Sequence, residues 1–206
     1  KRAFLLDLYS RGTTFGTIVG ADKPTAYSTF LIFIFLFAIY LAAWWASRSL
    51  KSREAWLLVL GWALLLSIPM LLLYPYGARD VFDYVMRARI FSVYGGNPFV
   101  NTTSAYPNDV FFPFAWWKEY PSPYGPLWEL LAGLATKAAG NNVLTNILAF
   151  KFIGLIFTFA TSGFIALTLR RHAPERALSG TLLFLWNPLV LFEVIGNAHN
   201  DITMLV

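Results

Sequence analysis

The 206-residue sequence contains no cysteine, so it has neither a disulfide framework nor a thiolate metal site. Charged residues are scarce, at 13% against roughly 25% in a soluble globular domain. The only two histidines, His172 and His199, lie too far apart in sequence to form a His-x-x-x-His pair. The net charge of +5 is not gathered into a continuous basic stripe, which argues against a nucleic-acid partner. We therefore expect no metal, no cofactor and no nucleic acid.

Apolar residues dominate instead. They make up 57% of the chain, aromatic residues make up 18%, and the mean hydropathy is +0.56. This composition is typical of membrane proteins and predicts an all-α integral membrane protein, built as a polytopic helical bundle. The chain opens on Lys1 and stops at Val206 inside an apolar run, and we interpret it as a fragment of a longer polytopic protein.

Four apolar segments are candidates for membrane spans: 26–46, 55–74, 144–169 and 177–195. About 20 residues at 1.5 Å each cover a hydrocarbon core of roughly 30 Å. Pro69 lies inside the second segment, and Asn187-Pro188 interrupts the fourth. We expect residues 1–25 to form an interfacial or loosely ordered tail, and residues 26–206 to be the N-terminal part of a polytopic domain.

The basic residues of the short loops predict the orientation. Arg48, Lys51 and Arg53 lie between the first two spans, and Arg170 and Arg171 follow the third. Because such loops stay in the cytoplasm, the long segment 75–143 is expected on the external side of the cell membrane. The apolar stretch 127–139 is about 13 residues long, too short to span, so we interpret it as interfacial or re-entrant.

Residues 80–93 have a helical pattern within this external loop. The apolar positions share one stripe: Phe82, Met86, Ile90 and Val93. The charged positions lie on the other side and its flanks: Arg79, Asp80, Asp83, Arg87 and Arg89. The pattern predicts an amphipathic helix lying on the membrane surface. Its charges could be a helix cap and an i,i+4 ion pair, or they could bind a lipid phosphate and deprotonate a hydroxyl.

Two further groups are candidate sites. Aromatic residues are dense around two proline-containing turns: Trp116, Trp117, Tyr120, Tyr124 and Trp128. They could form an interfacial aromatic belt or a platform for sugar rings or an isoprenoid chain. His199, Asn200 and Asp201 stand together at the external end of the fourth span, where they could cap the next helix or serve a functional site.

Five motifs follow one another along residues 74–201. They are Arg79-Asp80-Val81-Phe82-Asp83-Tyr84, Gly96-Asn97-Pro98-Phe99, Pro121-Ser122-Pro123-Tyr124-Gly125-Pro126-Leu127, Trp186-Asn187-Pro188-Leu189-Val190 and Gly196-Asn197-Ala198-His199-Asn200-Asp201. Their order resembles that of the bacterial α-1,6-mannosyltransferases that use polyprenyl-phosphate mannose, within the GT-C superfamily. The resemblance implies a catalytic aspartate in the first large external loop, at Asp80. At the position of Asp83 a small or polar residue is usual in the family, so Asp83 departs from the pattern. The resemblance therefore leaves open whether Asp80 or Asp83 is the base.

The resemblance implies a GT-C-like membrane glycosyltransferase. The donor would be a polyprenyl-phosphate sugar, and the acceptor an extracytoplasmic glycan or lipid. Asp80 or Asp83 would act as general base in an inverting displacement. The residues expected to bind substrate are Arg79, Arg87 and Arg89 on the leaving phosphate, Tyr124 and Trp128 on the sugar or isoprenoid, His199 and Asn200 on phosphate or hydroxyl, and Asp201 orienting His199.

Two alternatives remain open at this stage. A non-catalytic membrane scaffold or accessory subunit of a larger complex would bury Asp80, Asp83 and His199 in packed pairs. A transporter would need polar residues distributed through the spans, and the spans here are nearly free of them. Besides membrane lipids, other membrane subunits are possible partners.

Overall fold

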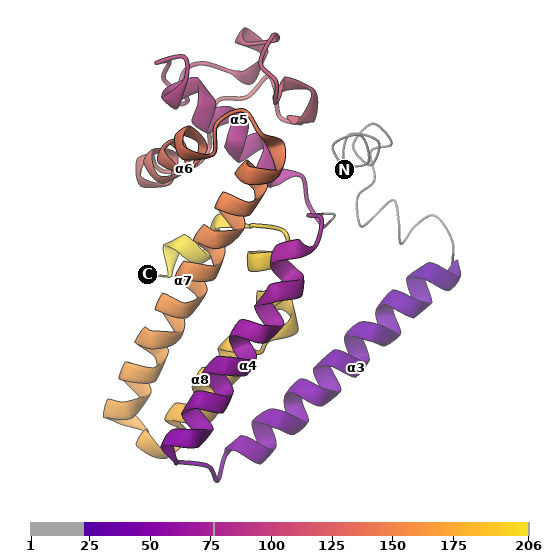
Figure 1. Ribbon diagram of the computed structural model, residues 1–206, viewed down its shortest axis with the longest axis vertical. Coiled ribbons are helices and arrows are strands. Elements are labelled where there is room, and N and C mark those ends of the chain that lie inside the picture. The colour runs from indigo at the N-terminus through magenta and orange to yellow at the C-terminus, as the bar shows by residue number, and fades with distance from the viewer. Residues whose placement is uncertain (1–22, 76, 206) are drawn as a thin grey trace.

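The computed structural model describes residues 23–75 and 77–205, and no strand occurs among them. The expected N-terminal tail lies almost entirely outside the described residues. Long helices run side by side along the molecule, and shorter helices and loops cover one end of them (Figure 1). We call this covering segment the cap, residues 77–142.

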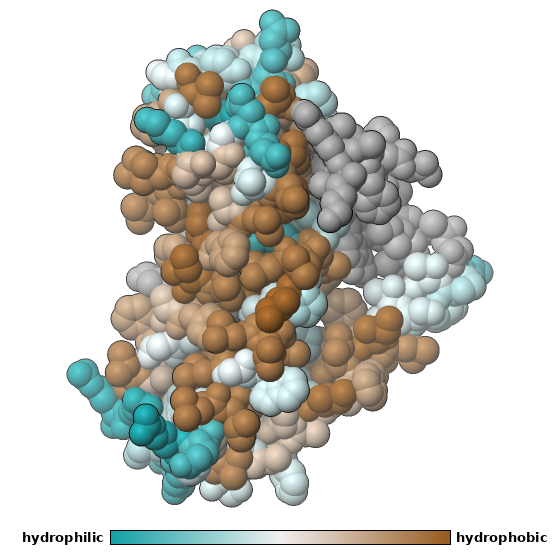
Figure 2. Space-filling model, in the orientation of Figure 1, coloured by the Kyte–Doolittle hydropathy of each residue, from teal (hydrophilic) through white to brown (hydrophobic). Residues whose placement is uncertain are grey.

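Among the described residues, three helices are long and apolar enough to cross a membrane. They are α3 (Lys23–Ser47), α4 (Arg53–Leu72) and α7 (Val143–His172). Their outward residues are mostly apolar, and Figure 2 shows an apolar band over the middle of the molecule with hydrophilic residues at its two ends. Because soluble proteins rarely expose so large an apolar surface, the fold is that of a helical membrane protein.

The fourth apolar segment is broken. Helix α8 (Ala177–Leu185) is followed by the π-helix η4 (Val190–Gly196), and the two are bent by 54°, so they form a fourth span only if the pair counts as one. Pro188 has no backbone N–H to continue the helix, and Oδ1 of Asn187 accepts the N–H of Leu189 at 2.9 Å. After this break, the helix η4 runs to the base of the cap and ends there.

The end of α4 is fixed from α7. Pro69 lies in the last turn of α4, and the fully buried Lys151 donates from Nζ to the carbonyl oxygens of Met70, at 2.7 Å, and Leu73. A cation at the C-terminus of a helix satisfies its unpaired carbonyls and its dipole. This contact holds the point where the chain leaves α4 for the cap.

The interpretation of residues 80–93 as an amphipathic surface helix needs correction. Helix α5 (Asp80–Ser92) is buried on all sides from Val81 to Ile90. Its apolar side chains share a core with the cap loop, α6 (Pro126–Ala139) and the start of α7, including Phe111, Phe114, Trp128 and Phe150. The polar side is buried as well, because the loop segment around the 3₁₀ turns η1 (Thr103–Ala105) and η2 (Phe112–Phe114) supplies partners for its charges.

Helix α6 packs along α5 through Glu129, Ala132 and Gly133, among other buried residues. Its opposite face exposes Leu127, Leu130 and Leu134. With 14 residues it is too short to span, in keeping with the prediction for 127–139, and its leucine face suits an interfacial position.

Candidate active site

Asp80 and His199 come together at the base of the cap. Asp80 is the first residue of α5, and His199 follows the turn after η4. Oδ2 of Asp80 lies 3.7 Å from Nε2 of His199, and the two side chains are 32% and 25% exposed. Both side chains are partly exposed, although the Nε2 atom of His199 that faces Asp80 is itself buried.

Asn197 joins the two motifs that carry these residues. Its Oδ1 accepts the N–H of Gly77 at 2.9 Å, and its Nδ2 donates to Oε2 of Glu193 at 3.0 Å. Asn197 is fully buried, and a Cβ on Gly77 would lie 2.2 Å from its Nδ2. Only glycine therefore allows this close approach. Neither Asn197 nor Glu193 was predicted as a site residue, because no local pattern reveals which side chain bridges two distant segments.

Three carboxylates surround His199. Besides Asp80, Oε2 of Glu193 lies 3.7 Å from Nε2, and Oδ2 of the exposed Asp201 lies 3.7 Å from Nδ1. Ala198, with φ of 60°, turns the chain so that the imidazole faces Asp80. In the part of the chain that the structure describes, Nε2 of His199 has no hydrogen-bond partner.

Asp83 lies deeper and has a different environment. It is 1% exposed, and its Oδ1 accepts the backbone N–H groups of Trp116 and Trp117 at 3.1 and 3.0 Å. Burial raises the pKa of the Asp83 carboxyl, against the lowering effect of these N–H groups and of Arg87. Asp83 therefore fixes the loop that carries two tryptophans, whereas Asp80 faces the surface.

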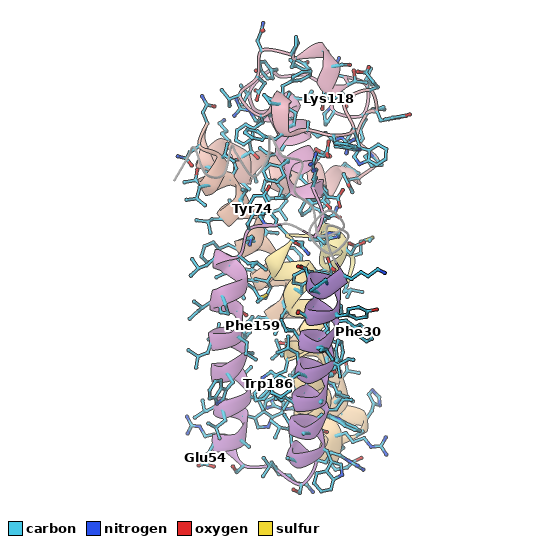
Figure 3. The ribbon with its side chains drawn as sticks, turned by 90° about the vertical axis from the view of Figure 1, so that its right-hand side faces the viewer. Phe30, Glu54, Tyr74, Lys118, Phe159 and Trp186 are labelled. Carbon is cyan, nitrogen blue, oxygen red and sulfur yellow. The ribbon has the colours of Figure 1, made fainter. Side chains whose placement is uncertain are left out.

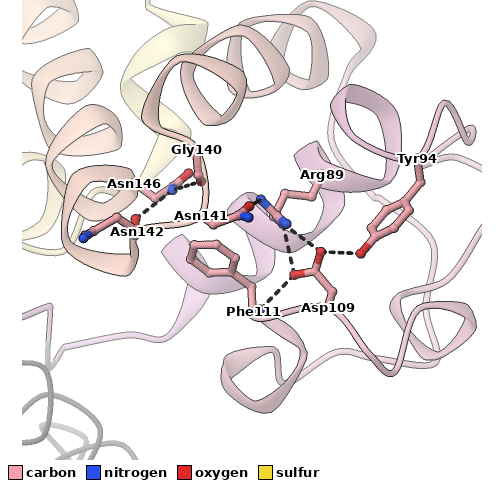
Figure 4. Close-up of polar contacts among 8 residues, drawn as sticks. All are labelled: Arg89, Tyr94, Asp109, Phe111, Gly140, Asn141, Asn142 and Asn146. Atoms are coloured by element: carbon pink, nitrogen blue, oxygen red, sulfur yellow. Dashed lines mark hydrogen bonds and ion pairs between the residues drawn. The ribbon is translucent and has the colours of Figure 1, made fainter.

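The three predicted phosphate-binding arginines are separated by the fold. Arg89 is buried, and its Nε donates to both carboxylate oxygens of Asp109 at 2.8 and 3.0 Å, while Nη1 donates to Asn141 (Figure 4). Oδ2 of Asp109 also accepts the hydroxyl of Tyr94 at 2.7 Å (Figure 4). This network connects α5 to the loop and to the segment after α6. Arg89 therefore stabilises the cap and is not placed to bind phosphate.

The other two arginines differ from each other in burial and in their contacts. Arg87 is buried, donates to the carbonyl of Trp117 at 3.4 Å and lies with Cζ 5.8 Å from the ring centroid of Tyr124. Arg79 is only half-buried, directly precedes Asp80, and places Cζ 4.9 Å from the ring centroid of Trp116. Arg79 is thus the arginine beside the surface of the site.

The predicted aromatic residues Tyr124 and Trp128 lie behind Asp80, around Tyr84. The ring of Tyr84 is 5.0 Å from that of Tyr124 and 5.2 Å from that of Trp128, both edge to face. The hydroxyl of Tyr84 donates to Oδ1 of Asn200 at 3.2 Å. Burial raises the pKa of both tyrosine hydroxyls. Trp128 is buried beneath this pair. Tyr84 connects the motif of Asp80 to that of His199 through Asn200. It was not predicted as a site residue, because in the sequence it is an ordinary aromatic position of the helix.

The carboxylates do not form a metal centre in this arrangement. Across residues 23–75 and 77–205, no group of three or more histidine and acidic side chains is placed to hold a metal ion.

Comparison with known proteins identifies the family. Residues 7–206 match the family described as α-(1→6)-mannopyranosyltransferase, N-terminal domain. The chain is 24% identical to the α-(1→6)-mannopyranosyltransferase A of Corynebacterium glutamicum over 66% of this chain and 28% of that protein. It is 28% identical to the Mycobacterium tuberculosis protein of the same name, over 66% of this chain and 26% of that protein.

The α-(1→6)-mannopyranosyltransferase B of C. glutamicum is 26% identical over 66% of this chain and 23% of that protein. The chain thus spans about a quarter of the length of these relatives. No solved structure matches it. The resemblance inferred from the motif order is confirmed: the chain belongs to the α-(1→6)-mannopyranosyltransferase family, and the match is to the family's N-terminal domain.

Proposed function

We propose that this chain provides the catalytic part of a GT-C-type membrane mannosyltransferase. The enzyme transfers a mannosyl group from a polyprenyl phosphate to an extracytoplasmic glycan or lipid acceptor, with inversion. The observation that carries the proposal is the pair of Asp80 and His199, two partly exposed side chains whose Oδ2 and Nε2 atoms lie 3.7 Å apart. The names of the relatives supply the sugar and the linkage.

The proposed topology has α3, α4, α7 and the bent pair α8–η4 crossing the cell membrane, with the cap outside. Arg48, Lys51 and Arg53 lie near the α3–α4 turn, and Arg170 and Arg171 end α7. These basic residues gather at the end of the bundle away from the cap, which supports a cytoplasmic location for that end. An external cap is where a polyprenyl-linked donor and a glycan can meet.

Asp80 is the proposed general base. It removes the proton of the acceptor hydroxyl while that oxygen attacks the anomeric carbon of the donor. The bond between the anomeric carbon and the phosphate oxygen breaks, and its electron pair leaves with the polyprenyl phosphate. Asp83 is unsuited to this task, since it is buried and already accepts two backbone N–H groups.

Negative charge grows on the departing phosphate. Arg79, held over the ring of Trp116 next to Asp80, is the proposed partner for this charge. His199 and Asn200 bind a phosphate oxygen or a sugar hydroxyl, and Asp201 orients His199 through Nδ1. Arg87 acts from beneath, on Asp83 and the loop, and Arg89 holds the cap together.

The geometry disfavours a scaffold that has lost activity. That alternative predicts Asp80, Asp83 and His199 in buried pairs, and of the three only Asp83 is buried.

The test is transfer from labelled polyprenyl-phosphate mannose by the enzyme in membranes. The wild type should transfer the label, and Asp80→Asn should lower the rate by at least about 100-fold, the lower range for a positioned general base. Glu119→Gln, which neutralises an exposed carboxylate elsewhere in the cap, is the matched control and should leave the rate unchanged. Transfer by Asp80→Asn at the wild-type rate would refute the assignment.

A further inference from the structure

Aromatic residues of the cap loop are directed outward. Trp116, Trp117 and Tyr120 are 62%, 50% and 62% exposed, and the rings of Trp117 and Tyr120 are 6.1 Å apart, edge to face. Neighbouring bulky rings on a surface indicate a binding function, because an isolated domain would bury them. Tryptophan and tyrosine are also the residues that contribute most to binding when they lie in an interface.

The backbone beneath these rings is held in place. Oδ1 of Asp83 binds the N–H groups of Trp116 and Trp117, and the carbonyl of Trp117 accepts from Arg87. One residue further, the carbonyl of Lys118 accepts the N–H of Ser104 at 2.9 Å. The rings are therefore presented by an anchored loop, which reduces the entropy lost when a ligand binds.

Their height argues against an aromatic belt at the membrane interface. Figure 3 places Lys118, which lies between Trp117 and Tyr120 in sequence, well beyond Tyr74 and at the opposite end of the molecule from Glu54. Tyr74 follows the end of α4, one of the candidate spans. Belt residues lie level with the helix ends, so these rings project past that level.

Contacts also connect the loop that holds these rings to the candidate active site. The guanidinium of Arg79, the residue before Asp80, packs over the ring of Trp116. Asp83, which binds the backbone of Trp117, is about one helical turn, roughly 5 Å, along α5 from Asp80. Arg79 and Asp83 therefore connect the first turn of α5, where Asp80 lies, to Trp116 and to the backbone of Trp117.

We propose that Trp117 and Tyr120 form an outer subsite for an oligosaccharide acceptor. The terminal hydroxyl lies at Asp80, and the preceding sugar units pack their C–H faces against the two rings while their hydroxyls stay in water. Lys118, which lies between Trp117 and Tyr120 in sequence, provides a polar rim. The inference rests on the proposed function and adds which residues of the cap hold the acceptor beyond its terminal sugar.

The experiment compares acceptor lengths. Initial rates are measured for the membrane-embedded enzyme with an α-1,6-linked mannosyl disaccharide and with the corresponding hexasaccharide. Trp117→Ala and Tyr120→Ala should each raise KM for the hexasaccharide by about tenfold, as expected for loss of an aromatic anchor. The KM for the disaccharide, the KM for the donor and kcat should not change.

The matched control is Trp45→Ala, which removes an equally large exposed ring from α3, near the turn to α4 at the end of the bundle away from the cap. Unchanged hexasaccharide kinetics in both loop variants would overturn the proposal. So would an equal rise in KM for both acceptors, or a change confined to membrane association.

A binding measurement separates this inference from the proposed function. Calorimetric titration of the purified enzyme with the hexasaccharide, without donor, should show weaker binding by Trp117→Ala than by wild type. If the wild type binds in this way but transfers no mannose, the proposed function fails and the subsite stands. If it transfers mannose but the variant binds equally well, the subsite fails alone.

Discussion

The amide side chain of Asn197 joins the N–H of Gly77 to the carboxylate of Glu193, and so fixes the segment before Asp80 against the turn that carries His199. Both ends of this amide are used, and the side chain is fully buried. The short distance between Asp80 and His199 is thus a consequence of one bridging residue at the base of the cap.

Replacing Gly77 with alanine should separate the two motifs. The added Cβ would lie 2.2 Å from Nδ2 of Asn197, closer than real Cβ atoms approach other atoms, so the Asn197 side chain or the loop must move and the bridge between them is broken. We expect kcat to fall at least tenfold, since a misplacement of about 1 Å can cost 100-fold. Gly61→Ala in α4 is the control: a Cβ there meets nothing within 4 Å, and its kcat should be unchanged. Wild-type kcat in Gly77→Ala would show that the bridge does not position the site.

Removing one partner from the buried pair of Arg89 and Asp109 should destabilise the cap. Asp109→Asn leaves the guanidinium buried without its counter-charge, which costs about 3–5 kcal/mol when a buried pair is broken. Thermal unfolding in detergent should show a clear loss. Glu175→Gln breaks the exposed pair with Arg176 and should change stability by less than about 1 kcal/mol. Equal effects of the two substitutions would contradict the structural role given to Arg89.

Glu129 should make stability depend on pH. Burial raises the pKa of its carboxyl above the ordinary value of 4.5, against the lowering effects of Ser122 and Arg87. The folded state therefore binds the proton more tightly than the unfolded state, and stability falls as pH rises from about 4.5 through the raised pKa. Glu129→Gln removes this loss, so its melting temperature relative to that of the wild type should rise as pH increases above about 4.5.

The comparison needs a control carboxylate, and Glu119→Gln provides one on the exposed part of the cap. Melting curves of the three proteins would be recorded at each pH. If the difference between Glu129→Gln and wild type stays constant with pH, or reverses in sign, the carboxyl of Glu129 does not titrate as its burial requires.

Asp83→Asn should weaken the loop while leaving the base intact. The amide can present its oxygen to the N–H groups of Trp116 and Trp117, but it loses the charge attraction to Arg87. We expect lower thermal stability and a reduction of kcat well below 100-fold, measured beside Asp80→Asn. A loss of kcat as large as that of Asp80→Asn, with unchanged stability, would move the base to Asp83.

The long helices could be predicted from sequence because hydrocarbon requires uninterrupted apolar runs, and α3, α4 and α7 satisfy this. The break in the fourth segment followed from Pro188. The prediction that α5 lies on the membrane surface was wrong. It assumed that the charged side of the helix faces water. Its actual partners, Asp109 and the backbone of Trp116, come from a loop without a helical or strand period.

The site was predictable only in part, for a similar reason. Asp80 and His199 were candidates from their motifs, but their contact is long-range and depends on Asn197. The three arginines looked equivalent on the helical pattern. Burial distinguishes them, and burial depends on the packing of the whole cap around α5.

The most direct test is a double-mutant cycle on Asp80 and His199, with transfer from labelled polyprenyl-phosphate mannose as the readout. If both side chains serve one transition state, Asp80→Asn combined with His199→Gln should be about as slow as Asp80→Asn alone, because residues that act as a unit are not additive. Rate losses that multiply in the double variant would show two independent sites and contradict the shared site at the base of the cap.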